Sequence, residues 1–445
     1  MVTGGRPLNG SVKIPAAKNS VLPLFAASLL CTGEVRLQAV PRLADVEHCM
    51  ALLRGVGCAA RWEGSDAVLS GPPANSTLPG QTAGQMRASI LFCAPLLARL
   101  GRAETSLPGG CRIGARPIDL HLAGLAKMGA VELEAGEGRL VLTAPSGLHG
   151  AEITLRFPSV GATETLLLAA ACAKGRTILR GAAREPEIAD LAAFLNRCGG
   201  CIEGAGSSTI RIEGRRVLSG CCFSPLPDRI FASTLACGCA AAGGRVELTG
   251  CAPALYAPVL EILEQMGCTV ERAHDAAAIS RFGALRGAGN VHTAPYPGLA
   301  TDAAPLLAAV MLYAQGESRL QDRVFENRFA CAEGFAALGA NVRVAERTLY
   351  VQPGGTLRGA KLTAPDLRGG AALVVEREHV DFVGQGIEGE IEGVAGADVF
   401  AIFHFGTVYQ HTTKLDVFLR QRAGFEKTGS PQPFVEPDRK STRLN

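Results

Sequence analysis

The sequence LAKMGAVELEA at residues 125–135 is one copy of a segment that recurs along the chain. It joins a helical apolar pattern to a strand-like one through a glycine, which suits a helix end that needs a left-handed turn. The other copies are LLRGVGCAARW (52–62), LNRCGGCIEGA (195–205), LEQMGCTVERA (263–273) and FAALGANVRVA (335–345). Their glycines, at positions 57, 129, 199, 267 and 339, are 72, 70, 68 and 72 residues apart. This spacing indicates an internal repeat.

Each repeat of about 70 residues is predicted to hold four strands and two helices in the order β-α-β-α-β-β. The second helix is apolar nearly all round, so we expect it to be buried on every side. Four such helices are predicted at residues 86–100, 161–173, 229–242 and 302–314. The sequence therefore predicts an α/β fold in which helices lie inside and sheets lie outside.

A sixth unit begins on time with DLRGGAALVV, from Asp366 to Val375. No further glycine stop or Ala-rich helix follows, and the composition shifts from Glu376 onward. We expect residues 376–445 to form an atypical C-terminal tail, either a disordered segment or a frameshift product.

Length and composition favour a globular protein of two or three domains. Of the 445 residues, 47% are hydrophobic and 19% are charged, and the net charge is only +3. Because Lys and Arg form no block of five or more, we expect no nucleic-acid partner. The apolar runs are too short or too interrupted for a membrane span, and the N-terminal residues do not resemble a signal peptide.

The 15 cysteines favour a reducing, cytoplasmic location. Most fall inside apolar helical patterns, where Cys behaves as a small hydrophobic residue. Cys198 and Cys201 have a C-x-x-C spacing, but no second pair or nearby His completes a zinc set. We therefore expect neither a metal nor a redox role for these two residues.

Cys111 is different, because it lies in the polar, Gly-rich loop LPGGCRIGARPIDLH (107–121). Arg112 and Arg116 stand near it, and guanidinium groups favour the reactive thiolate. Two interpretations stay open at this point: a reactive thiol on a closing loop, or a loop thiol without a chemical role.

Six of the predicted buried helices begin with charged or hydroxyl groups at equivalent positions of the repeat. A helix N-terminus attracts anions, so these groups could together line one cleft that binds an anionic ligand. Alternatively each is only a solvated side chain or a helix cap. The groups are Lys18 with Asn19, Arg87, Ser159, Arg229, Asp302, and Asp366 with Arg368.

Several stretches in fixed order make the chain recognisable. They are LNGSVKIPAAKNSVLP, MRASILF, LPGGCRIGARPIDLHLAGL, FPSVGATET, AAREPEI, LPDRI, TAPYPGLATDAAP, VFENRF and TAPDLR, spread over residues 5–375. In these stretches the chain resembles the UDP-N-acetylglucosamine 1-carboxyvinyltransferases of the enolpyruvyl transferase family. The shikimate-pathway members share the six-fold repeat but lack this Cys loop.

The resemblance implies a two-domain, inside-out α/β barrel of six repeats that closes over its substrates. One domain would comprise residues 1–17 and 226–375, and the other residues 18–225. The implied reaction moves the enolpyruvyl group of phosphoenolpyruvate to the 3′-hydroxyl of UDP-N-acetylglucosamine and releases phosphate. It proceeds through a tetrahedral ketal without a metal or organic cofactor.

The resemblance also implies roles for individual residues. Cys111 would protonate phosphoenolpyruvate and Asp302 would act as the base near the 3′-hydroxyl. Asp366 and Arg368 would line the cleft. Phosphoenolpyruvate would be held by Lys18, Asn19 and Arg116. The UDP-sugar would be seated by Arg87, Arg116, Pro117, Ile118, Asp119, Leu120, Ser159, Val160, Gly161, Asp302 and Val324.

The family continues its sixth unit with a buried helix and a basic residue that grips phosphoenolpyruvate, which residues 376–445 do not match. A second hypothesis is therefore a catalytically impaired protein that only binds a UDP-sugar. A shikimate-pathway enolpyruvyl transferase is a third and weaker alternative.

Overall fold

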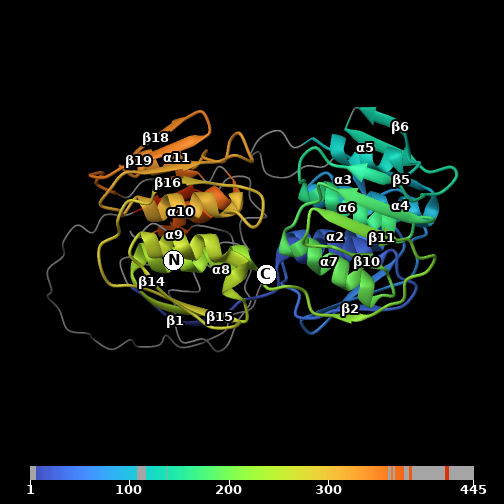
Figure 1. Ribbon diagram of the computed structural model, residues 1–445, viewed down its shortest axis with the longest axis horizontal. Coiled ribbons are helices and arrows are strands. Elements are labelled where there is room, and N and C mark those ends of the chain that lie inside the picture. Colours follow the sequence, from blue (N-terminus) through green and yellow to red (C-terminus); the bar gives the residue numbers. More distant parts are fainter. Residues whose placement is uncertain are drawn as a thin grey trace, which may run out of the picture.

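The computed structural model describes residues 7–107, 117–136, 138–358, 362–363, 366–374, 380–382 and 416–419. These residues build two separate hydrophobic cores, which form two lobes side by side in Figure 1. The first core uses residues between Val21 and Leu218. The second core uses Leu8, Ile14 and residues between Ala232 and Leu373. The domain boundaries at residues 17 and 225 stay a prediction.

Helices and sheets alternate around the first core. Its helices are α1 (Lys18–Ser28), α2 (Ala44–Gly55), α3 (Gly80–Ala83), the 3-10 helix η1 (Arg87–Phe92), α4 (Cys93–Leu100), α5 (Asp119–Lys127), α6 (Val160–Ala171) and α7 (Pro186–Arg197). Its strands are β2 (Val35–Leu37), β3 (Ala59–Glu63), β4 (Asp66–Ser70), β5 (Arg102–Ser106), β6 (Val131–Gly136), β7 (Arg139–Thr143), β8 (Glu152–Thr154), β9 (Arg176–Arg180), β10 (Ile202–Glu203), β11 (Thr209–Glu213) and β12 (Cys222–Phe223).

The second core is built in the same way. Its helices are α8 (Arg229–Ala242), η2 (Pro253–Tyr256), α9 (Ala257–Gln265), η3 (Thr301–Ala303), α10 (Ala304–Met311), α11 (Ala332–Ala337) and α12 (Leu367–Val374). Its strands are β1 (Leu8–Lys13), β13 (Gly244–Thr249), β14 (Thr269–Arg272), β15 (Ala276–Arg281), β16 (Gly289–His292), β17 (Ser318–Gln321), β18 (Asn341–Ala345), β19 (Thr348–Gln352), β20 (Leu362–Thr363), β21 (Val380–Phe382) and β22 (Asp416–Leu419).

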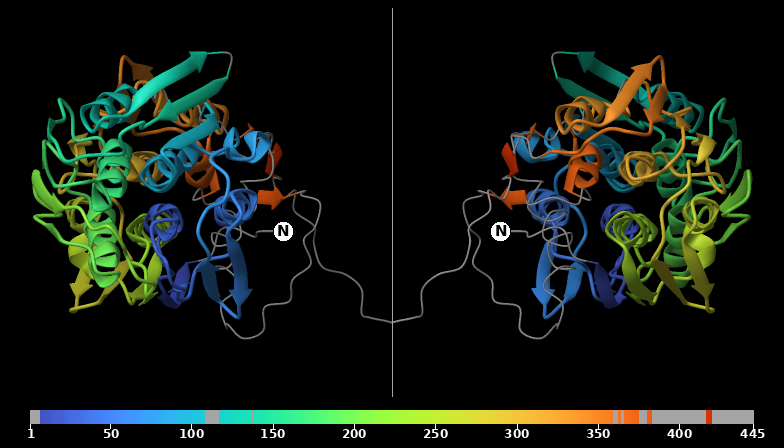
Figure 2. Two further views of the ribbon diagram at one scale, coloured as in Figure 1. Left: turned by 90° about the vertical axis from the view of Figure 1, so that its right-hand side faces the viewer. Right: turned by 90° about the vertical axis from the view of Figure 1, so that its left-hand side faces the viewer.

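The helices predicted to be buried on every side are buried over most of their length, although Leu100 at the end of α4 is exposed and Phe231 of α8 is only partly buried. Every residue of α6 from Ala162 to Ala171 is buried, and all eight residues of α10 are buried. Their small side chains let helices approach closely, so α10 packs on both α8 and α12. The sheets lie around these helices in both lobes (Figure 2).

Four sheets share one topology, in which a parallel pair of strands continues into an antiparallel hairpin. Their orders are β1-β13-β15-β14, β10-β11-β9-β8, β12-β2-β4-β3 and β16-β17-β19-β18. The other two, β5-β7-β6 and β20-β22-β21, are antiparallel. Because each sheet has open ends among the described residues, the structure shows a mixed α/β fold and no closed barrel.

The repeated glycine stops are confirmed. Gly57, Gly129, Gly199, Gly267 and Gly339 have φ angles of 94°, 95°, 93°, 109° and 93°. Residues with a side chain rarely adopt this conformation, which explains why glycine recurs there.

Two of the predicted helices start differently from the expectation. Residues 86–100 form η1 followed by α4, and residues 302–314 begin with η3 before α10. Pro95 and Pro305 lie in the first turns of α4 and α10. A proline tolerates that position but cannot bond to a preceding turn, so the α-helix begins only there.

Two segments of the C-terminal stretch, β21 and β22, are strands: β22 lies between β20 and β21 and pairs antiparallel with both. The rest of residues 376–445 lies outside the described residues. None of the described helices has the length and apolar character needed to cross a bilayer.

Candidate active site

All six groups singled out in the sequence lie at or next to the start of an α-helix or a 3-10 helix. Lys18, Arg87 and Arg229 are the first residues of α1, η1 and α8. Ser159 and Asp366 precede α6 and α12, and Asp302 lies in η3. The structure shows which of these groups cap a helix and which face other charges.

The start of α1 carries a paired lysine. Lys18 Nζ lies 2.9 Å from Asp45 Oδ2, and both side chains are about four-fifths buried. The interpretation of Lys18 as a freely solvated cation is therefore wrong. Asn19 is exposed and is not the cap, because the N-cap is Ala17, which has no side-chain hydrogen bond.

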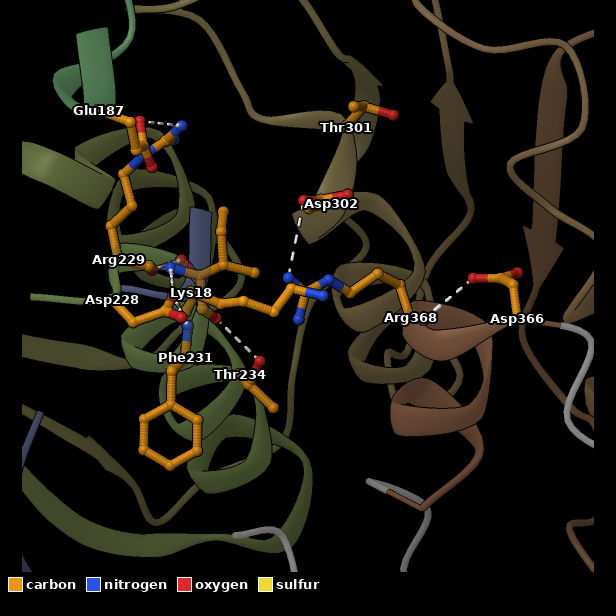
Figure 3. A network of polar contacts seen from close by, with 12 residues as sticks. Lys18, Glu187, Asp228, Arg229, Phe231, Thr234, Thr301, Asp302, Asp366 and Arg368 are labelled. Atoms are coloured by element: carbon orange, nitrogen blue, oxygen red, sulfur yellow. Dashed lines mark hydrogen bonds and ion pairs between the residues drawn. The ribbon is translucent and has the colours of Figure 1, made fainter. Parts of the chain in front are cut away.

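Asp302 does not cap its helix but meets two arginines, of which Figure 3 shows Arg368. Its Oδ1 accepts a hydrogen bond from an Arg328 guanidinium nitrogen at 3.1 Å. Its Oδ2 lies 3.7 Å from a guanidinium nitrogen of Arg368. The Asp302 side chain keeps 28% of its surface exposed, so it remains accessible to a ligand.

The pKa of Asp302 lies below its usual range. Burial of the carboxyl pushes this pKa up, but the attraction of nearby cations outweighs burial. The cations, in order of effect, are Arg368, Arg328, Arg229 and Lys18. Asp302 is thus an ionised carboxylate at neutral pH and a weak base.

Arg328, which donates to the Asp302 carboxylate, was not singled out from the sequence. It is almost completely buried, and its Nε donates to Thr301 Oγ1 at 2.9 Å. Thr301 Oγ1 in turn donates to Asp322 Oδ2, which lies 2.5 Å away. Asp322 Oδ1 accepts from the backbone N–H of Val324 at 2.8 Å. This network ties Val324 to Asp302. The quoted stretch VFENRF contains the arginine, but a sequence does not reveal that its guanidinium is buried.

Asp366 is a helix cap that positions Arg368. Asp366 Oδ1 accepts from the backbone N–H groups of Arg368 and Gly369, at 3.0 and 3.1 Å. Its Oδ2 is buried and has no hydrogen-bond partner among the described residues. Asp366 thereby fixes the start of α12, from which Arg368 reaches Asp302.

A second group of predicted residues gathers at the starts of α5 and α6. An Arg87 guanidinium nitrogen donates to the Pro117 carbonyl at 3.3 Å. Ile118 is the N-cap of α5, Asp119 pairs with Arg156, and Leu120 packs against the first core.

Ser159 caps α6, since its Oγ accepts from Ala162 N at 3.3 Å. Val160 and Gly161 are partly buried. A side chain at Gly161 would come within 3.1 Å of the His121 ring. The His121 side chain is buried, with 4% of its surface exposed, and its Nδ1 forms a hydrogen bond with Thr165 Oγ1 at 2.8 Å. Burial first, and then Arg87, lowers the His121 pKa to about 4.

Cys111 and Arg116 lie outside the described residues. Their loop leaves the end of β5 at Ser106 and returns to α5 at Asp119. Pro117, the first described residue after this loop, therefore contacts Arg87. Helix α1, whose first residue Lys18 acts electrostatically on Asp302, also contacts η1 and α6.

A buried ion pair links the two cores beside this site. Arg229, from α8, donates to both carboxylate oxygens of Glu187 in α7, at 2.9 and 3.2 Å. Only 11% of the Arg229 side chain and 4% of the Glu187 side chain are exposed. The sequence places Arg229 at a helix start, but nothing in it identifies Glu187 as the partner. Among the described residues, no group of three or more His, Cys, Asp or Glu side chains could hold a metal ion.

Residues 2–377 match the family model of EPSP synthase (3-phosphoshikimate 1-carboxyvinyltransferase). The chain belongs to this enolpyruvyl transferase family. The match ends within two residues of the composition shift at Glu376.

Within the enolpyruvyl transferase family, the chain is similar in sequence to enzymes named UDP-N-acetylglucosamine 1-carboxyvinyltransferase. The UDP-N-acetylglucosamine 1-carboxyvinyltransferase of Solidesulfovibrio magneticus is 43% identical over 380 residues, covering 84% of this chain and 90% of that protein. The enzyme of the same name from Caulobacter sp. strain K31 is 44% identical over 379 residues, covering 84% and 88%.

Solved enolpyruvyl transferase structures share the fold. The enolpyruvyl transferase NikO of Streptomyces tendae gives a TM-score of 0.74 at 24% identity, covering 84% of this chain and 89% of that one. An EPSP synthase of Acinetobacter baumannii gives 0.64 at 20% identity, covering 85% and 91%.

Proposed function

We propose that this chain transfers the enolpyruvyl group of phosphoenolpyruvate to the 3′-hydroxyl of UDP-N-acetylglucosamine and releases phosphate. This is the first committed step of peptidoglycan synthesis. One observation carries the proposal: the Asp302 carboxylate stands among basic side chains from both cores, at the meeting point of helix N-termini. The names of the 43–44% identical relatives support the choice of UDP-N-acetylglucosamine over shikimate 3-phosphate.

The chemistry needs a proton donor and a proton acceptor. The 3′-oxygen adds to C2 of phosphoenolpyruvate while a proton adds to C3, giving a tetrahedral ketal. Loss of phosphate from C2 and of a proton from C3 then restores the double bond. We assign proton delivery to Cys111 and proton removal from the 3′-hydroxyl to Asp302. Because Asp302 is a weak base, it accepts the proton as the new C–O bond forms rather than beforehand.

The substrates take separate parts of the site. Lys18, Asn19 and Arg116 hold phosphoenolpyruvate, whose carboxylate and phosphate require cationic partners. The UDP-sugar lies along Arg87, the segment 116–120, the N-terminus of α6 at residues 159–161, and Val324. Asp302 contacts its 3′-hydroxyl, and Asp366 and Arg368 line the cleft beside it.

We further propose the finer architecture. Residues 18–225 form one domain and residues 1–17 with 226–375 the other, each with three units of an inside-out barrel. The five recurrent glycines and the six sheets support this count. The sixth unit departs from the family after residue 375. The protein acts in the cytoplasm on small molecules, without nucleic acid, membrane, metal or organic cofactor.

Phosphate release from phosphoenolpyruvate tests the function directly. We expect release with UDP-N-acetylglucosamine and none with shikimate 3-phosphate. A folded protein that binds UDP-N-acetylglucosamine without releasing phosphate would instead be the impaired UDP-sugar-binding protein. Release only with shikimate 3-phosphate would establish the shikimate-pathway alternative.

Alkylation tests the role of Cys111. A small iodoacetamide should label Cys111 faster than Cys222, which is the exposed thiol among the described cysteines. Bound UDP-N-acetylglucosamine should change the Cys111 rate and leave the Cys222 rate unchanged. Equal labelling of both thiols, insensitive to the nucleotide sugar, contradicts a reactive Cys111.

A further inference from the structure

Three thiols from distant parts of the sequence, those of Cys31, Cys198 and Cys221, lie together in the first core, beyond the C-terminal ends of α1 and α7. Cys198 is the C-cap of α7, and its Sγ lies 3.3 Å from Cys221 Sγ. Cys31, just after α1, makes a further thiol contact with Cys198. Cys198 and Cys31 are 1% exposed, whereas Cys221 is half-buried.

The backbone fixes this pair. The N–H and the Oγ of Ser219 both donate to the Cys198 carbonyl, at 2.8 and 3.0 Å. The carbonyl of Cys221 accepts from Arg36 N at 2.9 Å, as the chain enters β12 beside β2. Phe194 of α7 and Phe223 of β12 meet edge to face with ring centroids 5.5 Å apart. The two sulfur atoms are therefore held together by contacts on both sides of them.

We propose that Cys198 and Cys221 form a reversible disulfide site that cross-links α7 to β12. Sulfur atoms held this close need only a small displacement to bond. The C-x-x-C spacing suggested Cys201 as the sole candidate partner of Cys198, and no redox role was expected. The fold instead supplies a partner 23 residues away, which a spacing rule does not detect.

The oxidant is a low-molecular-weight disulfide such as oxidised glutathione. The half-buried Cys221 thiolate attacks it and expels one glutathione thiolate, leaving a mixed disulfide. Cys198 then attacks the Cys221 sulfur and expels the second glutathione. Two electrons and two protons pass from the protein thiols to the oxidant, which becomes two glutathione thiols.

The site remains reduced until an oxidant arrives. Burial and the Cys198 thiol raise the pKa of Cys221 to about 12, while Arg197 opposes this effect and Cys222 adds slightly to it. Little thiolate therefore exists at neutral pH, and we expect the exchange rate to rise with pH.

Trypsin makes the bridge visible. Cleavage yields the peptides 19–36 with Cys31, 198–211 with Cys198 and Cys201, and 217–229 with Cys221 and Cys222. After treatment of the whole chain with oxidised glutathione, mass spectrometry should show peptide 198–211 joined to 217–229. Dithiothreitol should separate them. Thermal unfolding of the oxidised protein should occur about 5 °C higher, because the bridge restricts the unfolded chain.

Matched variants assign the sulfur atoms. The linked peptides should persist in Cys201→Ser and Cys222→Ser and disappear in Cys198→Ser and Cys221→Ser. Each of the four variants replaces one sulfur atom by oxygen. Circular dichroism of the same samples shows whether any variant has lost its fold, which would also remove the link. A link through Cys201 or Cys222, a bridge from Cys198 to Cys31, or only glutathione adducts would overturn the proposal.

Discussion

A charged residue at a helix start has two possible uses, and Asp302 and Asp366 illustrate both. Asp366 accepts backbone N–H groups and caps α12, whereas Asp302 makes no cap and pairs with Arg328 and Arg368. Their positions in the repeat were predictable from the sequence. Their partners were not, because Arg328 and Arg368 lie 26 and 66 residues beyond Asp302 and meet it only in the folded second core, Arg368 through the packing of α12 on α10.

Asparagine at position 302 tests the proposed base. Asp302→Asn keeps the shape and one acceptor for Arg328 but removes the charge and the capacity to accept a proton. We expect phosphate release to fall at least about 100-fold in kcat. The exposed Asp275→Asn on the second core should keep full activity. Activity of Asp302→Asn within about threefold of the unchanged protein would contradict the assignment.

Arg368 should make stability depend on pH through Asp302. The folded pKa of Asp302 is depressed, mainly by Arg368 among the cations, so this contribution is present above the unfolded pKa of about 3.9. It is lost as the pH falls through the folded pKa. Arg368→Ala should therefore cost more stability at pH 7 than at pH 3 in urea unfolding.

The exposed Arg180→Ala on β9 provides the comparison for Arg368→Ala. Its effect should be small and the same at both pH values. An Arg368→Ala effect that is equally large at pH 3 would mean that the guanidinium stabilises α12 without Asp302.

At the scale of elements, glycine sets how closely helices approach. Gly124 of α5 faces Leu166 of α6, and an added Cβ would lie 2.5 Å from Leu166 Cδ2. The sequence predicts both helices but not this contact, because glycine within a helix usually lowers helix propensity and gives no packing signal. The recurrent glycine stops were predictable, since there the backbone conformation itself demands glycine.

Gly124→Ala should destabilise the protein by about 1–3 kcal/mol, because crowding of Leu166 outweighs the gain in helix propensity. Urea unfolding measures this difference. Since α5 and α6 begin at the proposed UDP-sugar seat, the KM for UDP-N-acetylglucosamine should rise more than the KM for phosphoenolpyruvate.

Gly283→Ala is the matched control, because no heavy atom lies within 4 Å of its added Cβ. Its free energy of unfolding should stay within about 0.5 kcal/mol of the unchanged protein. An equal loss in both variants would show that the Leu166 contact is not the cause.

At the scale of the whole molecule, Glu187 and Arg229 join two cores that are otherwise built from separate residues. The pair is buried, so removing one partner leaves an uncompensated charge. The repeat and its spacing indicated two similar halves. They could not indicate how the halves contact each other, because that depends on side chains outside the repeated pattern.

A double-mutant cycle of Glu187→Gln and Arg229→Gln measures this link. Each single variant should lose about 3–5 kcal/mol of unfolding free energy, and the double variant should lose clearly less than their sum. The corresponding cycle on the exposed pair Arg245 and Glu271, 46% and 60% exposed, should give a coupling of about 1 kcal/mol or less. Equal couplings in the two cycles would contradict the role of burial.

The pairing of β1 with β13 has a consequence for synthesis on the ribosome. Leu8 lies opposite Gly244, so β1 meets its neighbour only after 236 further residues have been synthesised. At about 5–20 residues per second, this takes roughly 12–47 s. During that interval the first core can complete itself, while β1 remains unpaired. The second core is therefore expected to fold after the first, and chaperones that bind nascent chains would meet β1 as an unpaired strand.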